Sequence, residues 1–486
     1  MDMLQVHGKN IVDASGRPIT LKGFCLGGWM NMEDFIIGYP GSEEGIRHTM
    51  AETVGDKKAE VFFDTMLDYM FNEDDAKFMS DCGANSVRIA LNYRHFENDL
   101  NPFQYLEKGF KRLDKALDWF EKYNIYVFLD LHSVQGWQSP DWHCDNPIRR
   151  SLFWDHPHFQ DRCVELWKKF AQRYKNRSVI AGYDLMNEPV TNAWRGRIGA
   201  YYYPNWDAMN SFYKRIVTEI RKIDSKHIIC MEGDNFSGLF SGLEKPFTDN
   251  LVYSSHNYID PGMTGSYPGY CRTLAWWSGD ARNEEVWWDM KQQKKSFYGH
   301  EGTNFVQKHN VPLWVSEFGS SYAGAGEQIA DRMRSLDDQL TVFDEFGAHW
   351  SVWTYKDLGI IGSLMLDPES EYMKVTKSLR ERKEKLNADF GVFWLSENIA
   401  KEKTNDLADY IESVINEPYV SGVANRRYLG QAVFSEYSSD LMQRAYASIF
   451  KDMTEEQMEK VLQSFLIKNC IKNKALINVL KKHFKE

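Results

Sequence analysis

The sequence lacks any long hydrophobic run. No stretch of its 486 residues is apolar over the length needed to cross a bilayer, so we expect no membrane span. The first residues, MDMLQVHGKN, lack the apolar core of a signal peptide, and we expect a cytoplasmic protein, or a secreted one if a signal was removed. The 7 cysteines are scattered and odd in number, which predicts buried free thiols and favours a reducing compartment.

The sequence also has fewer basic than acidic residues, and it lacks several nucleotide-binding and metal-binding motifs. The net charge of −11 argues against nucleic acid as a partner. Neither G-x-G-x-x-G nor a Walker-type phosphate loop is present, which disfavours a doubly wound nucleotide-binding sheet. The sequence also lacks H-E-x-x-H and closely spaced Cys/His pairs, so we expect neither a catalytic metal nor another cofactor.

The overall composition indicates a large globular chain of enzyme size. Hydrophobic residues make up 43% and charged residues 26%, a balance typical of folded rather than disordered proteins. The length favours one large domain with an appendage. Aromatic residues reach 14%, which suits either a sugar-binding cleft or a large aromatic core.

Eight short strand patterns alternate with helical ones along the first three quarters of the chain. Residues 6–20 resemble a small hairpin that would plug the bottom of a barrel. Eight strands separated by helices predict a (β/α)8 barrel, which is also called a TIM barrel. The strands are expected at residues 21–29, 83–91, 125–132, 179–188, 227–232, 251–258, 311–317 and 348–355.

The connections are predicted less sharply. Residues 31–59 are expected as a loop with short helices, and residues 59–79 as one helix. After the eighth strand, a charged helix over 371–386 would close the barrel. We therefore expect a catalytic domain over residues 1–388 and a helical extension without strands over 389–486, docked on the barrel.

Two strand patterns stop at a glutamate, in AGYDLMNEPV (residues 181–190) and VPLWVSEFGS (residues 311–320). Pro189 ends the first strand, and Gly319 permits a sharp exit turn after the second. Both Glu188 and Glu317 should therefore lie at the carboxyl ends of parallel strands, where barrels bind ligands. A glycosidase of the two-carboxylate type needs this pair. The alternative is that both are solvated loop acids.

Six segments, SVRIAL, LDLHS, YDLMNEP, SSHNY, WVSEFG and SVWTYKD, occur in this order over roughly residues 6–370. Through these six segments and their order, the sequence resembles glycoside hydrolase family 5. The resemblance implies Glu188 as the general acid/base and Glu317 as the nucleophile, with retention of configuration if their carboxyl groups lie ~5–5.5 Å apart. It also implies that Arg88 and Tyr258 hydrogen-bond the nucleophile and that Asn187 binds the sugar 2-hydroxyl.

The resemblance implies three further binding residues. His132 and His256 would position the sugar and support the acid/base, although a histidine with apolar neighbours is often only a core residue. Trp353 would form the floor of the subsite for the cleaved sugar, with a core tryptophan as the alternative. The expected partner is a carbohydrate or glycoside substrate.

Two long loops, residues 133–155 and 259–296, carry tryptophans and would wall the site into a pocket. This favours exo action on β-glucosides or short β-glucans. Packing of the loops on the barrel flank, an endo-acting β-glucanase, a transglycosylase on the same site and a non-catalytic carbohydrate-binding barrel remain alternatives. The possible contacts to the aglycone are Trp137, Trp276, Trp277, Trp287 and Trp288.

Overall fold

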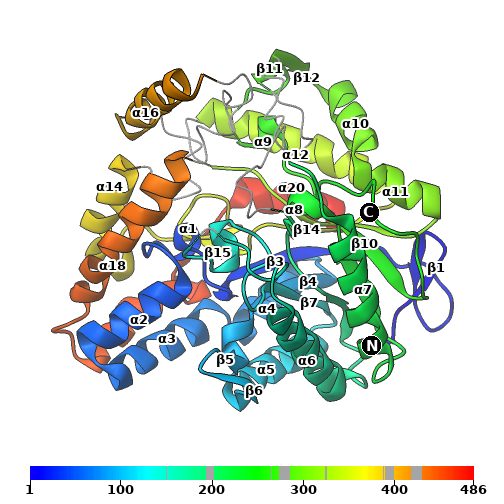
Figure 1. Ribbon diagram of the computed structural model, residues 1–486, viewed down its shortest axis with the longest axis horizontal. Coiled ribbons are helices and arrows are strands. Elements are labelled where there is room, and N and C mark those ends of the chain that lie inside the picture. The colour runs from blue at the N-terminus through cyan, green and yellow to red at the C-terminus, as the bar shows by residue number, and fades with distance from the viewer. Residues whose placement is uncertain are drawn as a thin grey trace.

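A closed barrel of parallel strands forms the centre of the molecule (Figure 1). The structure, a computed structural model, describes residues 1–148, 150–192, 202–263, 265–272, 285–322, 326–386, 388, 399–416 and 429–485. The prediction of a (β/α)8 barrel is confirmed. In order around the barrel, the strands are β10 (Leu251–His256), β13 (Leu313–Phe318), β14 (His349–Val352), β3 (Lys22–Met30), β4 (Ser86–Asn92), β7 (Tyr126–Ser133), β8 (Ile180–Asp184) and β9 (Ile228–Glu232).

Helices connect these strands and surround them. On α5, Phe110, Leu113, Leu117 and Phe120 are buried as one stripe, as the spacing predicts. The connecting helices are α4 (Glu73–Cys82), α5 (Glu107–Lys122), α6 (Pro157–Tyr174), α7 (Trp206–Arg221), α8 (Asp234–Ser237), α10 (Met290–Gly299), α11 (Glu301–His309) and α12 (Gly326–Phe346).

The amino-terminal hairpin closes the bottom of the barrel. Strands β1 (Gln5–His7) and β2 (Asn10–Val12) pair antiparallel, and Ile11 is fully buried. Ile11 belongs to an apolar cluster inside the barrel that includes Phe128 and Trp314, whose rings stack at 4.0 Å. This packing fills the lower barrel, so polar groups can gather only at the other end.

The region before β4 is more helical than predicted. Residues 31–59 contain α2 (Glu43–Val54), which begins where the Ser42 side chain accepts a hydrogen bond from the backbone of Gly45. The single helix expected over residues 59–79 is wrong. The chain forms α3 (Asp56–Met70) and then α4, because Asn72 and Asp75 make a reciprocal capping box that starts a new helix.

The helix that completes the outer ring is α20 (Lys474–Phe484), and not the charged helix over 371–386. Helix α20 packs between α12 and α4. The ring of Phe484 stacks on Trp350 at 5.1 Å and contacts Phe24 at 5.4 Å. His483 is buried and lies 2.7 Å from Asp344 and 2.9 Å from Asp337, both on α12.

The carboxyl-terminal region has further helices, two of which cover α2 and α3 on the side of the barrel (Figure 1). They are α13 (Glu371–Val375), α14 (Lys377–Lys385), α16 (Ile399–Ile415), α18 (Ser438–Ile449) and α19 (Glu455–Leu462), of which α18 packs on α2 and α19 on α3. The expectation that this region lacks strands is wrong, because β17 (Cys470–Lys472) pairs antiparallel with β16 (Leu364–Leu366). The division at residue 388 stays a prediction.

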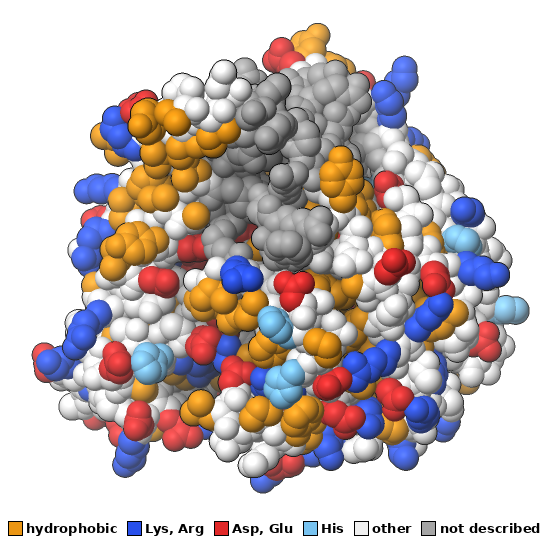
Figure 2. Space-filling model, in the orientation of Figure 1, with side chains coloured by type: hydrophobic (Ala, Val, Ile, Leu, Met, Phe, Trp, Pro, Cys, Tyr) orange, Lys and Arg blue, Asp and Glu red, His pale blue; other side chains and the backbone are white. Residues whose placement is uncertain are grey.

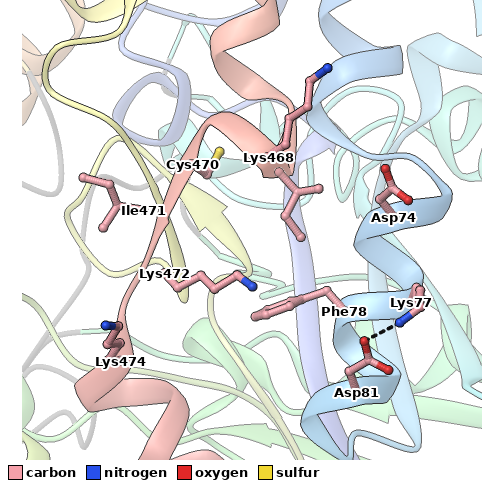
Figure 3. Close-up of a pocket in the computed structure, with 10 residues that line it drawn as sticks. Asp74, Lys77, Phe78, Asp81, Lys468, Cys470, Ile471, Lys472 and Lys474 are labelled. Carbon is pink, nitrogen blue, oxygen red and sulfur yellow. Dashed lines mark hydrogen bonds and ion pairs between the residues drawn. The ribbon is translucent and has the colours of Figure 1, made fainter.

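A groove of about 550 Å³ lies where β17 and α20 cross α4 (Figure 3). In it, Lys77 pairs with Asp81 at 2.6 Å, and the Lys472 ammonium lies 4.9 Å from the centre of the Phe78 ring. These contacts join the late segment of the chain to α4. The lining residues are Asp74, Lys77, Phe78, Asp81, Ile467, Lys468, Cys470, Ile471, Lys472 and Lys474.

The surface carries interspersed charges of both signs, and hydrophobic side chains gather over α16 on the face in Figure 2. The exposed apolar residues of α16 include Leu407, Tyr410 and Val414. In the described ranges, no helix is both long and apolar enough to cross a membrane. All seven cysteines are free and six of them are buried, as predicted.

The contacts of His483 predict a pH-dependent part of the stability. Burial alone would lower the pKa of His483, but the bonds to Asp344 and Asp337 outweigh it and raise the pKa above 6.5. This stabilisation is therefore complete below the unfolded pKa and is lost as the pH rises through the folded pKa. We expect His483→Leu to lower the free energy of unfolding by about 2 kcal/mol near pH 6 and by less near pH 9.

Urea unfolding at the two pH values measures this difference. The matched control is Lys482→Ala, which removes a partly exposed partner of the same Asp337 and should cost under about 1 kcal/mol. A cost of His483→Leu that grows with pH would contradict the assignment.

Candidate active site

Arg88 occupies the centre of the upper barrel, on β4, and is fully buried. Its guanidinium is surrounded by acidic and amide side chains from four neighbouring strands or the loops that come after them. Its partners are Glu317 (Nη1 to Oε2, 3.0 Å), Asp184 (Nε to Oδ2, 3.0 Å), Asn187 (Nη2 to Oδ1, 2.7 Å), Glu232 (Nη2 to Oε1, 3.1 Å) and Asp130 (Nη2 to Oδ2, 3.1 Å).

The Arg88 guanidinium alone cannot neutralise four buried carboxylates, so some of these carboxylates must be protonated. Burial raises the pKa of Asp130 to about 8, against the opposing charge of Arg88. Burial and the neighbouring Glu232 raise the pKa of Asp184 well above its ordinary value. Around neutral pH this layer therefore holds protons as well as the Arg88 charge.

Glu317 is the next-to-last residue of β13, and both of its side-chain oxygens accept hydrogen bonds. The Tyr258 hydroxyl donates to Oε1 at 2.8 Å, and Arg88 donates to Oε2. Burial raises the pKa of Glu317. The neighbouring His256 lowers this pKa in part, and the negative charge of Glu188 raises it further. The side chain is 9% exposed, so one face of the carboxylate remains open to a ligand.

Glu188 lies beyond the end of β8, which stops at Asp184 and not at residue 188 as expected. The backbone leaves the sheet register early, with Asn187 N–H donating to the Leu131 carbonyl. Glu188 has a φ of 46°, a conformation rare for a residue with a side chain, and its N–H donates to Glu232 Oε2 at 2.8 Å. Glu232 therefore holds the backbone that aims Glu188.

Each oxygen of Glu188 faces a histidine. His256 Nδ1 lies 2.6 Å from Oε1, and His143 Nε2 lies 3.3 Å from Oε2. Burial opposes ionisation of Glu188, but the two histidines outweigh it and lower its pKa to about 2. Burial lowers the pKa of His256, yet Glu232, Glu317 and Glu188 together raise it well above 6.5. The shared proton thus belongs to His256, and Glu188 is its carboxylate partner.

One oxygen each of Glu188 and Glu317 and one nitrogen of His256 lie within 4.8 Å of one another. Such a triangle has the ligand types for a cation. A protonated His256 has no lone pair to offer a metal, and Arg88 and Tyr258 already bind Glu317. The arrangement is therefore better suited to proton transfer and to attack by a carboxylate.

His132 and Trp353 form a flat wall beside the two glutamates. The rings stack in parallel, 9° apart, at 5.3 Å. His132 Nδ1 lies 2.7 Å from Asp130, and the Asn187 amide lies 3.2 Å from Nε2. Burial lowers the pKa of His132 well below 6.5, which leaves a neutral ring that can accept from Asn187. The structure thus brings together all eight predicted residues of the site core.

The loop tryptophans are placed differently from one another. Trp137 is half-buried, and its indole N–H donates to the Asp145 carbonyl. Trp288 is 5% exposed and donates to Gln293, which leaves little of its ring for a ligand. Trp287 is 49% exposed. Trp276 and Trp277 lie outside the described residues, and contact of these tryptophans with an aglycone stays a prediction.

Sequence reasoning overlooked five polar residues near the glutamates. Asp184 and Glu232 end their barrel strands, and Asp130 interrupts the apolar run of β7 as Arg88 interrupts that of β4, so all three could have been found. Glu33 and His143 come from irregular loops, where no periodic pattern marks them. Both are buried in the site.

Arg88 should dominate the stability of this end of the barrel. We expect Arg88→Met to lower the free energy of unfolding by about 3–5 kcal/mol, because it leaves buried carboxylates without their cation. Arg88→Lys should lower the free energy of unfolding by a smaller amount than Arg88→Met, because lysine keeps the positive charge although it lacks the several N–H donors of the guanidinium.

Chemical denaturation monitored by tryptophan fluorescence measures both costs. Arg215→Met, which removes an exposed ion pair with Asp161, is the matched control and should cost under about 1 kcal/mol. Equal stability of Arg88→Met and the unchanged protein would refute the central role of Arg88.

Comparisons with known proteins agree with this geometry. The family described as "Cellulase (glycosyl hydrolase family 5)" matches residues 49–359. The "Beta-xylosidase" of Phanerodontia chrysosporium is 32% identical over 99% of this chain and 98% of its own. The "Glucan 1,3-beta-glucosidase" of Schwanniomyces occidentalis is 28% identical over 69% of this chain and 83% of its own.

A solved structure described as an endogalactoceramidase shares the fold, with a TM-score of 0.52 and 16% identity over 74% of this chain and 75% of that one. The family match spans well over half of the chain, and the similarity to the xylosidase spans nearly all of it. The chain therefore belongs to glycosyl hydrolase family 5 and is a glycoside hydrolase that acts on β-glycans.

Proposed function

We propose that the protein is a retaining, exo-acting β-glycosidase that removes one sugar at a time from the non-reducing end of its substrate. The observation that carries exo action is the pair of loops tied together beside β3 and β7. Asn31 accepts from the Ser133 hydroxyl at 2.6 Å and donates to the His143 carbonyl at 3.2 Å. Asn92 donates to Asp145 at 3.0 Å. These hydrogen bonds would close this side of the site to a longer chain of sugars.

In the first chemical step, a lone pair of the Glu317 carboxylate forms a bond to the anomeric carbon. The bond from that carbon to the glycosidic oxygen breaks. The proton that His256 holds passes to the Glu188 carboxylate, and the Glu188 carboxyl group delivers it to the glycosidic oxygen. Arg88 and Tyr258 hold Glu317 in line for this attack. Asn187 is the ligand for the 2-hydroxyl.

In the second step, Glu188 removes a proton from water, and the oxygen of that water attacks the anomeric carbon. The bond to Glu317 breaks and returns its carboxylate. The 4.8 Å limit on the separation of one oxygen of each glutamate supports retention, since inverting enzymes keep their carboxyl groups ~6.5–9.5 Å apart. Oxygens this close leave little room for a water between enzyme and sugar.

The sugar subsite would be bounded by Trp353, His132 and Glu33. Oε1 of Glu33 is buried, lies 3.5 Å from His132 Nε2 and makes no hydrogen bond within the described residues. Burial raises the pKa of Glu33 well above its ordinary value, which keeps it protonated and able to donate to a sugar hydroxyl. An unsatisfied buried carboxyl of this kind supports a closed subsite for one terminal sugar.

The sugar itself is proposed from relatives. The relative that matches nearly the whole chain is named a β-xylosidase, and another is named a glucan 1,3-β-glucosidase. We therefore propose terminal β-D-xylose as the first substrate and terminal β-D-glucose as the second, with xylo- or gluco-oligosaccharides as their carriers.

The roles of the two glutamates are tested by chemical rescue. Glu317→Ala should reduce turnover of aryl β-glycosides about 10³-fold or more, and azide should give an α-glycosyl azide. Glu188→Ala should spare substrates with good leaving groups, and azide should give a β-glycosyl azide. NMR spectroscopy of the products identifies the configuration.

The exposed Glu52→Ala is the control and should behave as the unchanged protein. Exchanged azide products would mean that the two roles are swapped. Full activity of both glutamate variants would place the reaction elsewhere, and sugar binding without turnover by the unchanged protein would favour the non-catalytic barrel.

The exo mode is tested by products from β-linked xylo- and gluco-oligomers at early times. We expect a monosaccharide and an oligomer shortened by one unit, because the tied loops close one side of the proposed sugar subsite. Chromatography of the digest resolves these products. A ladder of mid-sized oligomers would instead identify an endo-acting cleft, and longer oligomers at high acceptor concentration would identify a transglycosylase.

A further inference from the structure

We infer that His143 is a positioning residue for the acid/base Glu188, and that it holds the carboxylate oxygen that meets the leaving group. This inference rests on the proposed function and names a residue that the sequence motifs do not contain. The observation that carries it is a buried imidazole nitrogen directed at the catalytic carboxylate from a loop outside the barrel strands.

The geometry singles out Nε2 of His143. This atom lies 3.3 Å from Glu188 Oε2, and the His143 side chain is 8% exposed. Nε2 is buried and makes no hydrogen bond within the described residues, so the ion-pair distance to Glu188 is its one polar contact there. A buried polar nitrogen normally has a hydrogen-bond partner, and the Glu188 carboxylate is the acceptor within reach.

The loop around His143 is built to keep it in place. His143 lies in the short helix η2 (Trp142–Cys144), and its carbonyl accepts from the Asn31 amide at 3.2 Å. The next turn is fixed at Asp145, whose carboxylate accepts from Asn92 at 3.0 Å and from Arg94 at 3.2 Å. The position of His143 is therefore determined by contacts to residues at or just beyond the carboxyl ends of β3 and β4, and not by the substrate.

The two oxygens of Glu188 are held unequally. Oε1 is bound by His256 at 2.6 Å, a short charge-assisted contact that fixes it. Within the described part of the chain, Oε2 has only the longer contact to His143, so it is the oxygen that can approach the glycosidic oxygen. A donor on Oε2 keeps the carboxylate aimed as the proton leaves, and it stabilises the ionised form that later acts as the base.

The surroundings determine how His143 should affect the pH profile. Glu188 is faced by His256 from β10, Glu232 from β9, Glu317 from β13 and His132 from β7. His143 itself is faced by Glu188 and, edge-on at 6.0 Å, by the His132 ring. Glu33 also faces Glu188, from the loop after β3. His143 lies on a different loop, so its removal leaves the charges of the barrel strands and of Glu33 in place.

The experiment compares His143→Phe, His143→Gln and His143→Asn on aryl β-glycosides with poor and good leaving groups. We expect His143→Phe to lower kcat/KM about 10-fold or more for a poor leaving group and to change it little for a dinitrophenyl glycoside. The basic limb of its pH profile should move to higher pH, because a group that favours the Glu188 carboxylate is gone. His143→Gln, which returns an N–H near the place of Nε2, should recover most of the loss, and the shorter His143→Asn should not.

A double-mutant cycle with Glu188→Ala separates positioning from loop folding. If His143 acts through Glu188, then His143→Phe should cost nothing further in the Glu188→Ala background. His95→Gln is the matched control. Like His143, His95 is a largely buried histidine that contacts a buried glutamate, in this case Glu43. This control should leave the dependence on the leaving group unchanged.

Two results would overturn the inference. One is an equal loss by His143→Phe on good and poor leaving groups, with an unmoved basic limb. The other is an undiminished effect of His143→Phe in the Glu188→Ala background. If Glu188→Ala itself shows no dependence on the leaving group, the proposed role of Glu188 fails first, which distinguishes the two failures.

Discussion

The ion cluster around Arg88 is the constraint on which the site depends. Four carboxylates from strands β7, β8, β9 and β13 point into one buried space, and a single guanidinium lies among them. Because each interaction fixes a strand end, the cluster determines where Glu317 and the Glu188 backbone lie. A buried ionic network of this kind is costly in desolvation, and its use here is positional: it turns the top of the barrel into a rigid template.

This template explains why acid and base roles can coexist within a few ångströms. Glu317 is held by Arg88 and Tyr258 as an open-faced carboxylate, while Glu188 shares a proton with His256. The tight pair with His256 makes the acid a two-residue unit in which the imidazole stores the proton. In the proposed mechanism, esterification of Glu317 removes its negative charge, and the same unit then loses part of its affinity for the proton. Electrostatics alone thus favours the change from acid to base.

Strand periodicity was sufficient to predict the barrel and its polar end, but it carried no information about the loops. Eight strands and the positions of Arg88, Glu188 and Glu317 could be placed, because polar residues interrupt apolar runs at their ends. His143 could not be found, since its role comes from a tertiary tie between its carbonyl and Asn31, far apart in sequence. The break between α3 and α4 was missed although Asn72 and Asp75 form a capping box, because the apolar spacing continues across it. The outer position of α20 likewise depends on partners that no local pattern encodes.

The place of α20 in the outer ring has a consequence for how the protein is made. Roughly 120 residues separate the end of β14 from the start of α20. At ribosomal speeds of roughly 5–20 residues per second, all eight strands have been synthesised roughly 6–24 s before their last covering helix. During that interval Phe24 and Trp350 lack the Phe484 ring that covers them in the finished protein. The seam between β14 and β3 therefore lacks its covering aromatic ring until translation supplies α20.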